Sequence, residues 1–216
     1  MTKVIEVSHL GKKYGQRTIF KDVSFAVERG EFVAIVGPSD SGKSTLLNML
    51  GLLEAVDQGE IKLLGKPMPK VNSRQATKLR RQQLNYLFQS FALIQTKTVE
   101  ENLLLAMAFV KKSKREKQKE IDQVLASLDL SKVKQSKVQT LSGGEQQRCA
   151  LARAILKPGE IVLADEPTGA LDAKRAQAAI CGFIHFYGWD CCRIIVSCSA
   201  TIFLWSTSSR IILNRQ

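Results

Sequence analysis

Short runs of β-branched and other apolar residues alternate along the chain with segments in which apolar residues recur every three or four positions. The first pattern predicts β-strands and the second predicts amphipathic helices. We expect strands at residues 3–7, 23–27, 32–36, 60–64, 84–88, 161–164, 193–197 and 210–213. The run at 161–164 is apolar at every position, as is typical of a strand that is buried on both faces of a parallel sheet.

Three segments have helical spacing. Their apolar positions are Leu46, Leu47, Leu50 and Leu53 after Lys43, then Val99, Leu103, Ala106 and Val110 after Thr98, then Ile121, Val124, Leu125 and Leu128. Because strands and helices alternate, the sequence predicts an α/β fold with parallel strands. Strand patterns are missing between about residues 90 and 145. We expect residues of about 90–157 to form a helical subdomain inserted into a core of about residues 1–89 and 158–216, within one domain.

Composition limits the class of protein. The 216 residues are 44% hydrophobic and 24% charged, which is typical of one globular domain with a sizeable core. No apolar run reaches the roughly 18–20 residues that span a bilayer. The N-terminus leads directly into strand-like sequence, so we expect no signal peptide and a cytoplasmic location. The five cysteines are odd in number and lack metal-ligand spacing, which argues against a disulfide framework.

The net charge of +12 is the one unusual feature of the composition. Such a balance can indicate binding to nucleic acid or to the anionic face of a membrane, or simply a solvated basic surface. The densest basic run, at residues 111–117, contains no aromatic residues and is therefore a poor surface for stacking bases. We interpret the charge as membrane-proximal or solubilising and expect no nucleic-acid partner.

The strongest chemical signal follows the strand expected at 32–36. The spacing there is that of a phosphate-binding loop, or P-loop, G-x4-G-K-[ST], and its residues are Gly37, Pro38, Ser39, Asp40, Ser41, Gly42, Lys43, Ser44 and Thr45. A strand leads into the loop and a helix leaves it, so backbone N–H groups converge on one point that suits a polyphosphate. We expect Lys43 to reach the β- and γ-phosphates of ATP and Ser44 to place its hydroxyl on Mg²⁺.

Asp40 is an unusual residue for the interior of such a loop. Aspartate tolerates the left-handed backbone conformation that these loops use. Its negative charge should nevertheless repel phosphate unless the side chain points away. We therefore expect Asp40 to weaken nucleotide binding without abolishing it.

A second motif is an apolar strand that ends in two acids, Asp165 and Glu166. An acid at the end of a buried strand is costly unless it serves a cation, so we expect Asp165 to hold Mg²⁺. Glu166 comes one residue later and is the natural general base for an attacking water. Many P-loop proteins would satisfy these two motifs.

A third motif is narrower. Residues 141–148 read LSGGEQQR, in which Ser142 is expected to cap a helix that begins with Gly143 and Gly144, forming a second anion site. This segment resembles the LSGGQ-type signature of ATP-binding cassette (ABC) ATPases and lies just before the acidic strand, as it does in that family. The resemblance covers residues 1 to about 175 and implies a P-loop NTPase core of the ABC ATPase type with a small N-terminal antiparallel β part.

The resemblance assigns roles to further positions. Tyr14 resembles the aromatic residue that stacks on adenine. Gln89 resembles the glutamine that contacts Mg²⁺ and the membrane subunit, and Asp172 resembles an aspartate that crosses the dimer interface. The family implies a catalytic role for Glu166, Lys43 and Gln89, a head-to-tail homodimer with ATP at its interface, and a separate transmembrane permease at the inner face of the membrane. Residues 89–94 and 163–172 look most like exporters of macrolides, lipoproteins and bacteriocins.

One family residue is missing. The family has a histidine after the strand that follows the two acids, where it contacts the γ-phosphate, and Cys198 occupies that position here. The two histidines of the chain, His9 and His185, lie elsewhere. The closing strand still resembles that of the family, so we interpret the C-terminal quarter as divergent and expect weakened ATP hydrolysis.

Three hypotheses follow. The first is an ATP-hydrolysing motor subunit of an ABC exporter, with ATP and Mg²⁺ as its cofactors. The second is a nucleotide-gated binding subunit that closes on ATP but hydrolyses it poorly, and only a turnover assay separates it from the first. The third is an ABC ATPase acting on nucleic acid or ribosomes, which the absence of a coiled-coil insert or a second cassette disfavours.

Overall fold

The protein is described here by a computed structural model, which places residues 2–165, 193–198 and 209–212. Within these ranges the elements are β1 (Lys3–Tyr14), β2 (Arg17–Glu28), β3 (Phe32–Val36), α1 (Lys43–Leu50), β4 (Gln58–Leu63), β5 (Lys66–Pro67), α2 (Arg74–Gln82), β6 (Leu84–Leu87), α3 (Val99–Ala106), α4 (Lys114–Ser127), the 3₁₀ turns Ser131–Val133 and Val138–Thr140, α5 (Gly143–Leu156), β7 (Ile161–Asp165), β8 (Arg193–Cys198) and β9 (Ser209–Ile212).

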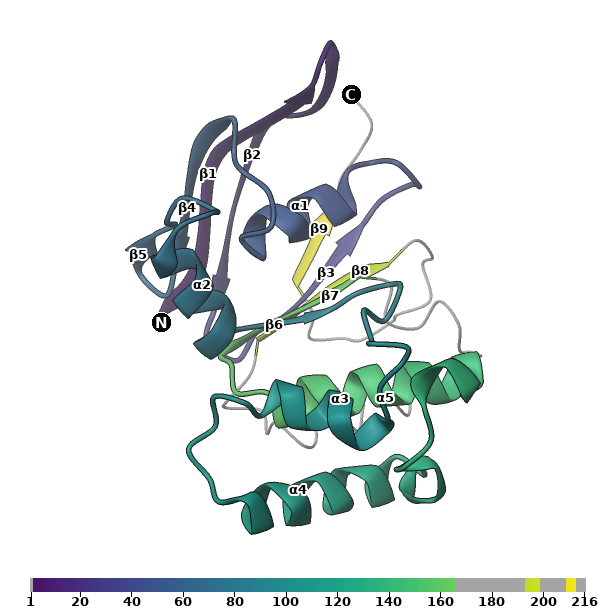
Figure 1. The fold of residues 1–216 in the computed structure, drawn as a ribbon. Helices are drawn as coiled ribbons and strands as arrows, with labels where there is room; N and C mark the ends of the chain where they lie inside the picture. Colours follow the sequence, from purple (N-terminus) through teal and green to yellow (C-terminus); the bar gives the residue numbers. More distant parts are fainter. Residues whose placement is uncertain (1, 166–192, 199–208, 213–216) are drawn as a thin grey trace.

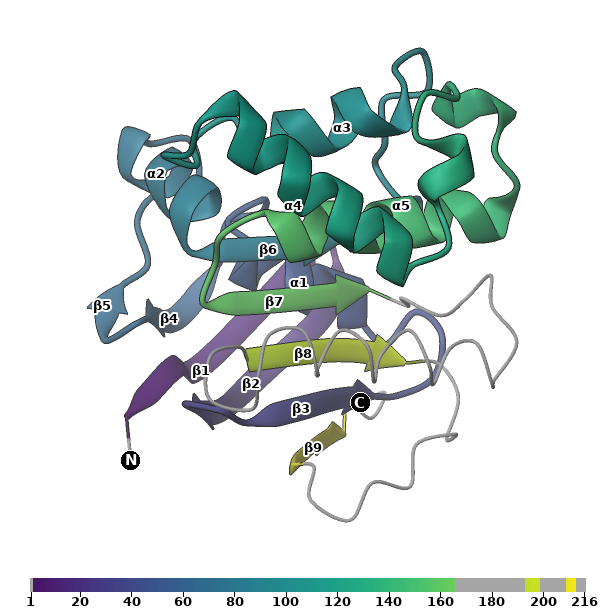
Figure 2. The ribbon, with the colours of Figure 1, turned by 90° about the horizontal axis from the view of Figure 1, so that it is seen from below.

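The strands form two sheets. Strands β2-β1-β4-β5 make an antiparallel sheet, and β6-β7-β8-β3-β9 make a sheet in which every pairing is parallel. Helix α1 packs against one face of the parallel sheet, on the side of the antiparallel sheet, and α3, α4 and α5 lie on the other side (Figures 1 and 2). The architecture is the predicted α/β fold with a small antiparallel part at its N-terminal end.

Two apolar clusters hold these layers together. One joins α1 to β1, β3, β4 and β7, and includes the fully buried side chains of Ile5, Leu46, Leu47 and Ile35. The other joins α3, α4 and α5 to the far face of β6 and β7, around Leu103, Leu125 and Val162. The apolar strand β7 contributes to both clusters, because its neighbouring residues point to opposite faces of the sheet.

Each of the expected strands is present, but several lengths differ. Strands β1 and β2 extend far beyond the predicted runs because they pair through irregular register, with shifts around Val7 to Leu10. His9 lies there with a left-handed φ of 51°, so the alternation of apolar and polar residues is lost at that point. Strand β5 was not predicted, because its two residues, Lys66 and Pro67, carry no strand pattern.

The predicted helices also differ from the observed ones in length and number. The expected stripe from Leu46 to Leu53 is wrong at its end, because α1 stops at Leu50 and Leu53 is 44% exposed. Helix α3 likewise ends at Ala106, before Val110. Helix α2 was missed because only Ala76 of its residues is buried, which leaves no apolar stripe to recognise. No helix in the described ranges is both long and apolar enough to cross a bilayer.

Helix α5 is tied to β6 by polar contacts as well as apolar ones. The buried side chain of Asn85 donates from Nδ2 to the carbonyl oxygens of Ala154 at 3.3 Å and Lys157 at 2.9 Å. Lys157 in turn donates from Nζ to the carbonyl of Arg80 at 2.7 Å and to the carbonyl of Leu84. Burial, together with the nearby positive charge of Arg153, lowers the pKa of Lys157 to about 8.

We expect the pH dependence of stability to reveal this buried amine. Folded Lys157 loses its proton near pH 8, whereas a lysine in the unfolded chain keeps it up to about pH 10.4. The unfolded state therefore binds more protons in this window, so stability should rise with pH by about 1 kcal/mol relative to a Lys157→Met variant. Urea unfolding of both proteins at about pH 7.5, 8.5 and 9.5 measures this difference. A difference that stays constant with pH would contradict the lowered pKa.

Candidate nucleotide-binding site

The predicted P-loop lies between β3 and α1, as its sequence requires. Lys43 is only 5% exposed, and its Nζ donates to the carbonyl oxygens of Gly37 at 3.0 Å and Pro38 at 2.9 Å. The lysine therefore folds back over the loop and holds a positive charge inside it. The buried hydroxyl of Ser41 has no hydrogen-bond partner within the described part of the chain, which leaves a polar atom of the loop available to a ligand.

The N-terminus of α1 differs from those of the other α-helices that the structure describes. Helices α2 to α5 begin at Ser73, Thr98, Ser113 and Ser142, and each of these side chains accepts a hydrogen bond from the helix backbone. Helix α1 begins after Gly42, has no side-chain cap and has no acidic residue in its first turn. Its first N–H groups are thus directed into the loop without a protein cap, which is the arrangement that binds phosphate.

Two residues of the loop adopt left-handed backbone conformations. Gly42 has a φ of 93°, and a Cβ atom built on it would lie 2.4 Å from Cγ2 of Ile19 and 2.7 Å from Cζ of Phe20. Asp40 has a φ of 62°, which agrees with the expectation that an aspartate tolerates this position, and it is exposed. Its backbone carbonyl lies 3.4 Å from Nη2 of Arg17, on the β1–β2 hairpin.

Parallel pairing brings the other predicted residues to the same edge of the sheet. Ala164 pairs with Leu87, so the carboxyl ends of β7 and β6 are adjacent. Asp165 comes one residue after Ala164, and Gln89 comes two residues after Leu87. Asp165 pairs with Ser197, and Val36, which precedes the P-loop, pairs with Cys198. The backbone of Cys198 therefore lies next to the strand that enters the P-loop, where the family histidine was expected.

Asp165 is 8% exposed at the end of β7. Burial and then the charge of Asp165 raise the pKa of Tyr86, whose hydroxyl donates to Oδ1 of Asn48 on α1 at 2.9 Å. Sequence reasoning missed both Tyr86 and Asn48, because each lies within an element whose apolar residues dominate the pattern. Together they link β6 to the P-loop helix through a neutral phenol and an amide, within electrostatic reach of Asp165.

The described residues hold no group of three or more His, Cys, Asp or Glu side chains that could bind a metal ion by themselves. Mg²⁺ in proteins typically binds one or two protein oxygens together with waters and substrate phosphates, rather than a cage of side chains. The carboxylate of Asp165 and the exposed hydroxyl of Ser44 are compatible with that donor set.

The segment after Gln89 is strained and anchored. Gln89 is exposed, and Phe91 and Ala92 have left-handed φ values of 63° and 48°. Such conformations cost about 1–2 kcal/mol for each non-glycine residue. Arg153 of α5 donates from Nη2 to the carbonyl of Phe91 at 2.8 Å and from Nη1 to the carbonyl of Ala92. Hydrogen bonds to a charged group contribute about 1.5–3 kcal/mol each, which is enough to offset the strain.

Tyr14 lies at the edge of the same region. It is 47% exposed, its hydroxyl donates to Oε1 of Glu54, and the side chain of Thr45 at the start of α1 lies near enough to influence the pKa of Tyr14. Burial and the hydrogen bond to Glu54 raise the pKa of Tyr14. Nζ of Lys12 stands 5.3 Å from the centre of the ring. The ring is therefore held beside the P-loop helix.

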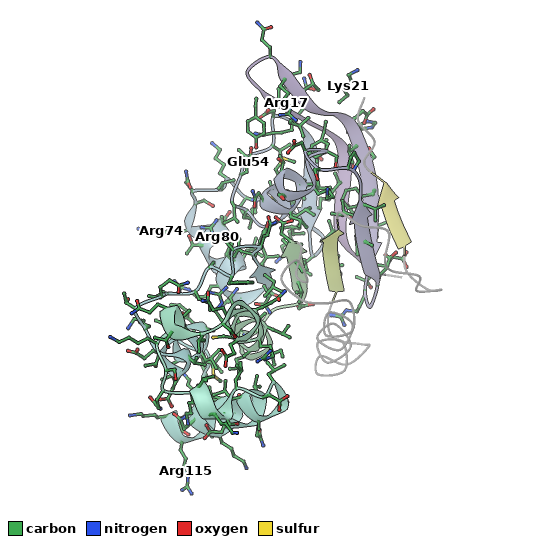
Figure 3. The ribbon with its side chains drawn as sticks, turned by 90° about the vertical axis from the view of Figure 1, so that its right-hand side faces the viewer. Arg17, Lys21, Glu54, Arg74, Arg80 and Arg115 are labelled. Carbon is green, nitrogen blue, oxygen red and sulfur yellow. The ribbon has the colours of Figure 1, made fainter. Side chains whose placement is uncertain are left out.

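Lys12 was not predicted as part of the site. It is 7% exposed and forms ion pairs with Glu54 at 3.1 Å and Asp57 at 3.0 Å. Burial alone would lower the pKa of Lys12, but its hydrogen bonds to these two carboxylates outweigh burial and raise it. Figure 3 shows Glu54 in the same part of the molecule as Arg17, whereas Arg115 of the basic run extends from the opposite end.

The signature residues lie elsewhere in the chain's fold. Ser142 caps α5 as predicted, with its Oγ accepting from the backbone N of Glu145 at 3.4 Å while Glu145 accepts from the backbone N of Ser142 at 2.9 Å. The hydroxyl and backbone of Ser142 lower the pKa of Glu145, so a carboxylate stands at this helix end.

Helices α5 and α1 lie on opposite sides of the parallel sheet (Figures 1 and 2). Glu166 and Asp172 lie outside the described residues.

An uncapped helix after the parallel strand β3, a buried lysine in the connecting loop and an acid at the end of β7 define a P-loop nucleotide-binding fold. The ABC transporter family model matches residues 20–169. The chain therefore belongs to the ABC transporter family.

Several curated relatives are similar over most of the chain. The macrolide export ATP-binding/permease protein MacB of Mannheimia succiniciproducens is 40% identical over 178 residues, covering 81% of this chain and 28% of the relative. The bacitracin export ATP-binding protein BceA of Halalkalibacterium halodurans is 36% identical, covering 81% and 70%. The lipoprotein-releasing system ATP-binding protein LolD of Porphyromonas gingivalis is 39% identical, covering 81% and 80%. The alignment thus spans just over a quarter of the MacB relative.

A solved cassette shares the fold. The dimeric structure of MJ0796, a bacterial ABC transporter cassette, is 32% identical with a TM-score of 0.85, covering 97% of this chain and 94% of its own. The same cassette in a post-hydrolysis state bound to ADP and Pi is 33% identical with a TM-score of 0.81, covering 91% and 88%. The fold is that of an ABC ATPase.

Replacing Gly42 with alanine should disrupt the P-loop. The added Cβ would collide with Ile19 and Phe20, and the left-handed backbone adds about 1–2 kcal/mol of strain by itself. Gly65→Ala is a matched control, because Gly65 has a φ of 74° with nothing within 4 Å of a built Cβ. We expect urea unfolding to show a clearly larger loss of stability for Gly42→Ala, and equal losses would contradict the close packing at Gly42.

Proposed function

We propose that this chain binds MgATP and hydrolyses it as the motor subunit of an ABC exporter. The observation that carries the proposal is the uncapped N-terminus of α1, directed into a loop that already holds the buried ammonium of Lys43. A helix terminus, a buried cation and the orphan hydroxyl of Ser41 together favour a polyphosphate ligand. Family membership and the ADP- and Pi-bound cassette with the same fold support ATP as that ligand.

Each described residue then has a specific task. Lys43 would leave the carbonyls of Gly37 and Pro38 and contact the β- and γ-phosphates, and Ser44 and Asp165 would hold Mg²⁺ with Gln89 nearby. Mg²⁺ supplies positive charge that neutralises the phosphate oxygens. Glu166 would accept the proton of the attacking water as general base. The ring of Tyr14 would stack on adenine, supported from one side by Lys12.

A homodimer would complete the site. Helices α1 and α5 lie on opposite sides of the parallel sheet, so one chain does not bring its own signature residues over its own P-loop. Two chains arranged head to tail would place Ser142, Gly143 and Gly144 of one subunit at the P-loop of the other, with Asp172 at the interface. The dimeric MJ0796 cassette, which has the same fold, supports this arrangement.

The proposal for a membrane partner and a cargo rests on the relatives. The names of BceA, LolD and MacB refer to bacitracin export, lipoprotein release and macrolide export, respectively. By analogy, the chain would work at the cytoplasmic face of the membrane, bound to a separate permease, and drive export of a peptide, bacteriocin or lipoprotein-like cargo. Gln89 and the segment after it would contact the permease.

A second candidate function is a nucleotide-gated binding subunit that hydrolyses ATP poorly. The position of Cys198 supports it, because its backbone pairs with Val36 just before the P-loop, where a histidine donor was expected. A thiol is a weak hydrogen-bond donor and does not carry the positive charge of an imidazolium. Both candidates bind ATP and differ only in turnover.

The variant Lys43→Ala tests the proposed ligand. It removes the buried cation of the P-loop, so binding of a fluorescent ATP analogue should fall below detection. Lys119→Ala, which removes an exposed lysine on α4, serves as the control for the loss of one charge and should bind normally. Undiminished binding by Lys43→Ala would overturn the assignment of the site.

The rate of hydrolysis tests the role of Cys198. Losing one preorganised donor typically costs about 2.7–4 kcal/mol, or roughly 10²–10³ in rate. We therefore expect the natural chain to bind MgATP but turn it over slowly, and Cys198→His to raise turnover with little change in affinity. Phosphate release measured at saturating ATP decides between the two candidates. Fast turnover that Cys198→Ala leaves unchanged would show that another group orients the water.

A further inference from the structure

Helix α5 holds the segment that follows Gln89. One guanidinium, that of Arg153, donates to the carbonyls of both Phe91 and Ala92, two and three residues after Gln89. Both acceptor residues have left-handed backbones, which persist only where the surrounding structure fixes them. Among the described residues, Arg153 is the one whose side chain donates hydrogen bonds to the carbonyls of both Phe91 and Ala92.

The hydrogen bonds to these two carbonyls also provide acceptors for the guanidinium of Arg153. No carboxylate forms an ion pair with its guanidinium in the part of the chain that the structure describes, and burial lowers the pKa of Arg153. A half-buried cation without hydrogen-bond acceptors is strongly unfavourable. The two carbonyls therefore stabilise Arg153 while Arg153 stabilises them, and neither group has another hydrogen-bond partner among the described residues.

The other end of β6 is fixed to the same helix. Lys157, one turn after Arg153, donates to the carbonyls of Arg80 in α2 and of Leu84 at the start of β6, and Asn85 donates back to the carbonyls of Ala154 and Lys157. Helix α5 is thus attached before and after the strand that leads to Gln89. These contacts connect residues 89–92 to the C-terminal end of α5, whose other end begins at Ser142, so a displacement of residues 89–92 would act on that helix.

We propose that Arg153 is a positioning residue that fixes residues 89–92 and transmits their conformation to the signature end of α5. The inference deepens the proposed function, on which it rests, because Gln89 and Ser142 have roles there in different nucleotide sites. A change sensed at Gln89 in one site would alter the helix end offered to the other. Arg153 itself touches no substrate.

The first test needs no nucleotide. Hydrogen exchange of the full-length protein is measured for Arg153→Met, which keeps an apolar stem but removes both donors, and for Lys157→Met as the matched control on the same helix. We expect amides in residues 89–93 to exchange about tenfold faster in Arg153→Met and at the normal rate in Lys157→Met. Arg153→Lys keeps the charge without the two-pronged donor, so it should give an intermediate rate.

The second test asks whether Arg153 acts through Gln89. Under single-turnover conditions, Arg153→Met should lower the hydrolysis rate by about tenfold while changing the ATP dissociation constant by less than about twofold. In a double-mutant cycle, adding Arg153→Met to Gln89→Ala should slow the reaction no further. Lys157→Met should leave the rate unchanged in both backgrounds.

The outcomes separate this inference from the proposed function. Normal exchange at residues 89–93 in Arg153→Met, equal acceleration in Lys157→Met, or additive losses with Gln89→Ala would each overturn the role of Arg153. A natural protein that neither binds nor hydrolyses ATP would overturn the proposed function instead. The nucleotide-free exchange experiment would then still decide whether Arg153 fixes the segment.

Discussion

Parallel pairing of the five-stranded sheet is the constraint on which the candidate site depends. Because β3, β6 and β7 run in the same direction, their carboxyl ends meet at one edge, and each strand ends at or just before a residue with a proposed function. The P-loop follows β3, Gln89 follows β6, and Asp165 closes β7. These positions are distant in sequence, yet the register leaves little freedom in how they meet. A slip of one residue in β7 would turn Asp165 to the other face of the sheet.

A recurring device inside this fold is a buried or half-buried cation that donates to backbone carbonyls. Lys43 does this in the P-loop, Arg153 after β6, and Lys157 before it. Arg80 similarly donates to the carbonyls of Leu52 and Val71. With 32 basic and 20 acidic residues, the chain lacks enough carboxylates to pair every cation. Carbonyl oxygens at strand and helix ends take their place, so part of the basic excess serves the fold itself.

The sequence predicted what depends on local pattern. The P-loop, the strand ending in Asp165 and the cap at Ser142 were found because spacing, apolar runs and capping residues are local signals. Exposed helix α2 and the irregular stretch around His9 were missed because they lack apolar periodicity. The contacts of Arg153, Tyr86 and Lys12 were also missed, because each partner lies far along the chain and no short motif encodes it. Roles of Glu166 and Asp172, and the division into core and subdomain, remain predictions.

The departures from the family pattern do not all act on the same step. Asp40 lies within the phosphate loop, but its backbone fits the left-handed geometry and its side chain is exposed, so it opposes phosphate only through a solvent-screened charge. Cys198 ends β8, and its backbone pairs with Val36 just before the P-loop, so its proposed effect is on the hydrolysis step. The uncapped helix and Lys43, which would govern affinity in the proposed site, are both present. The physical expectation is therefore a chain whose binding of nucleotide is retained and whose divergence is concentrated in the rate of the chemical step.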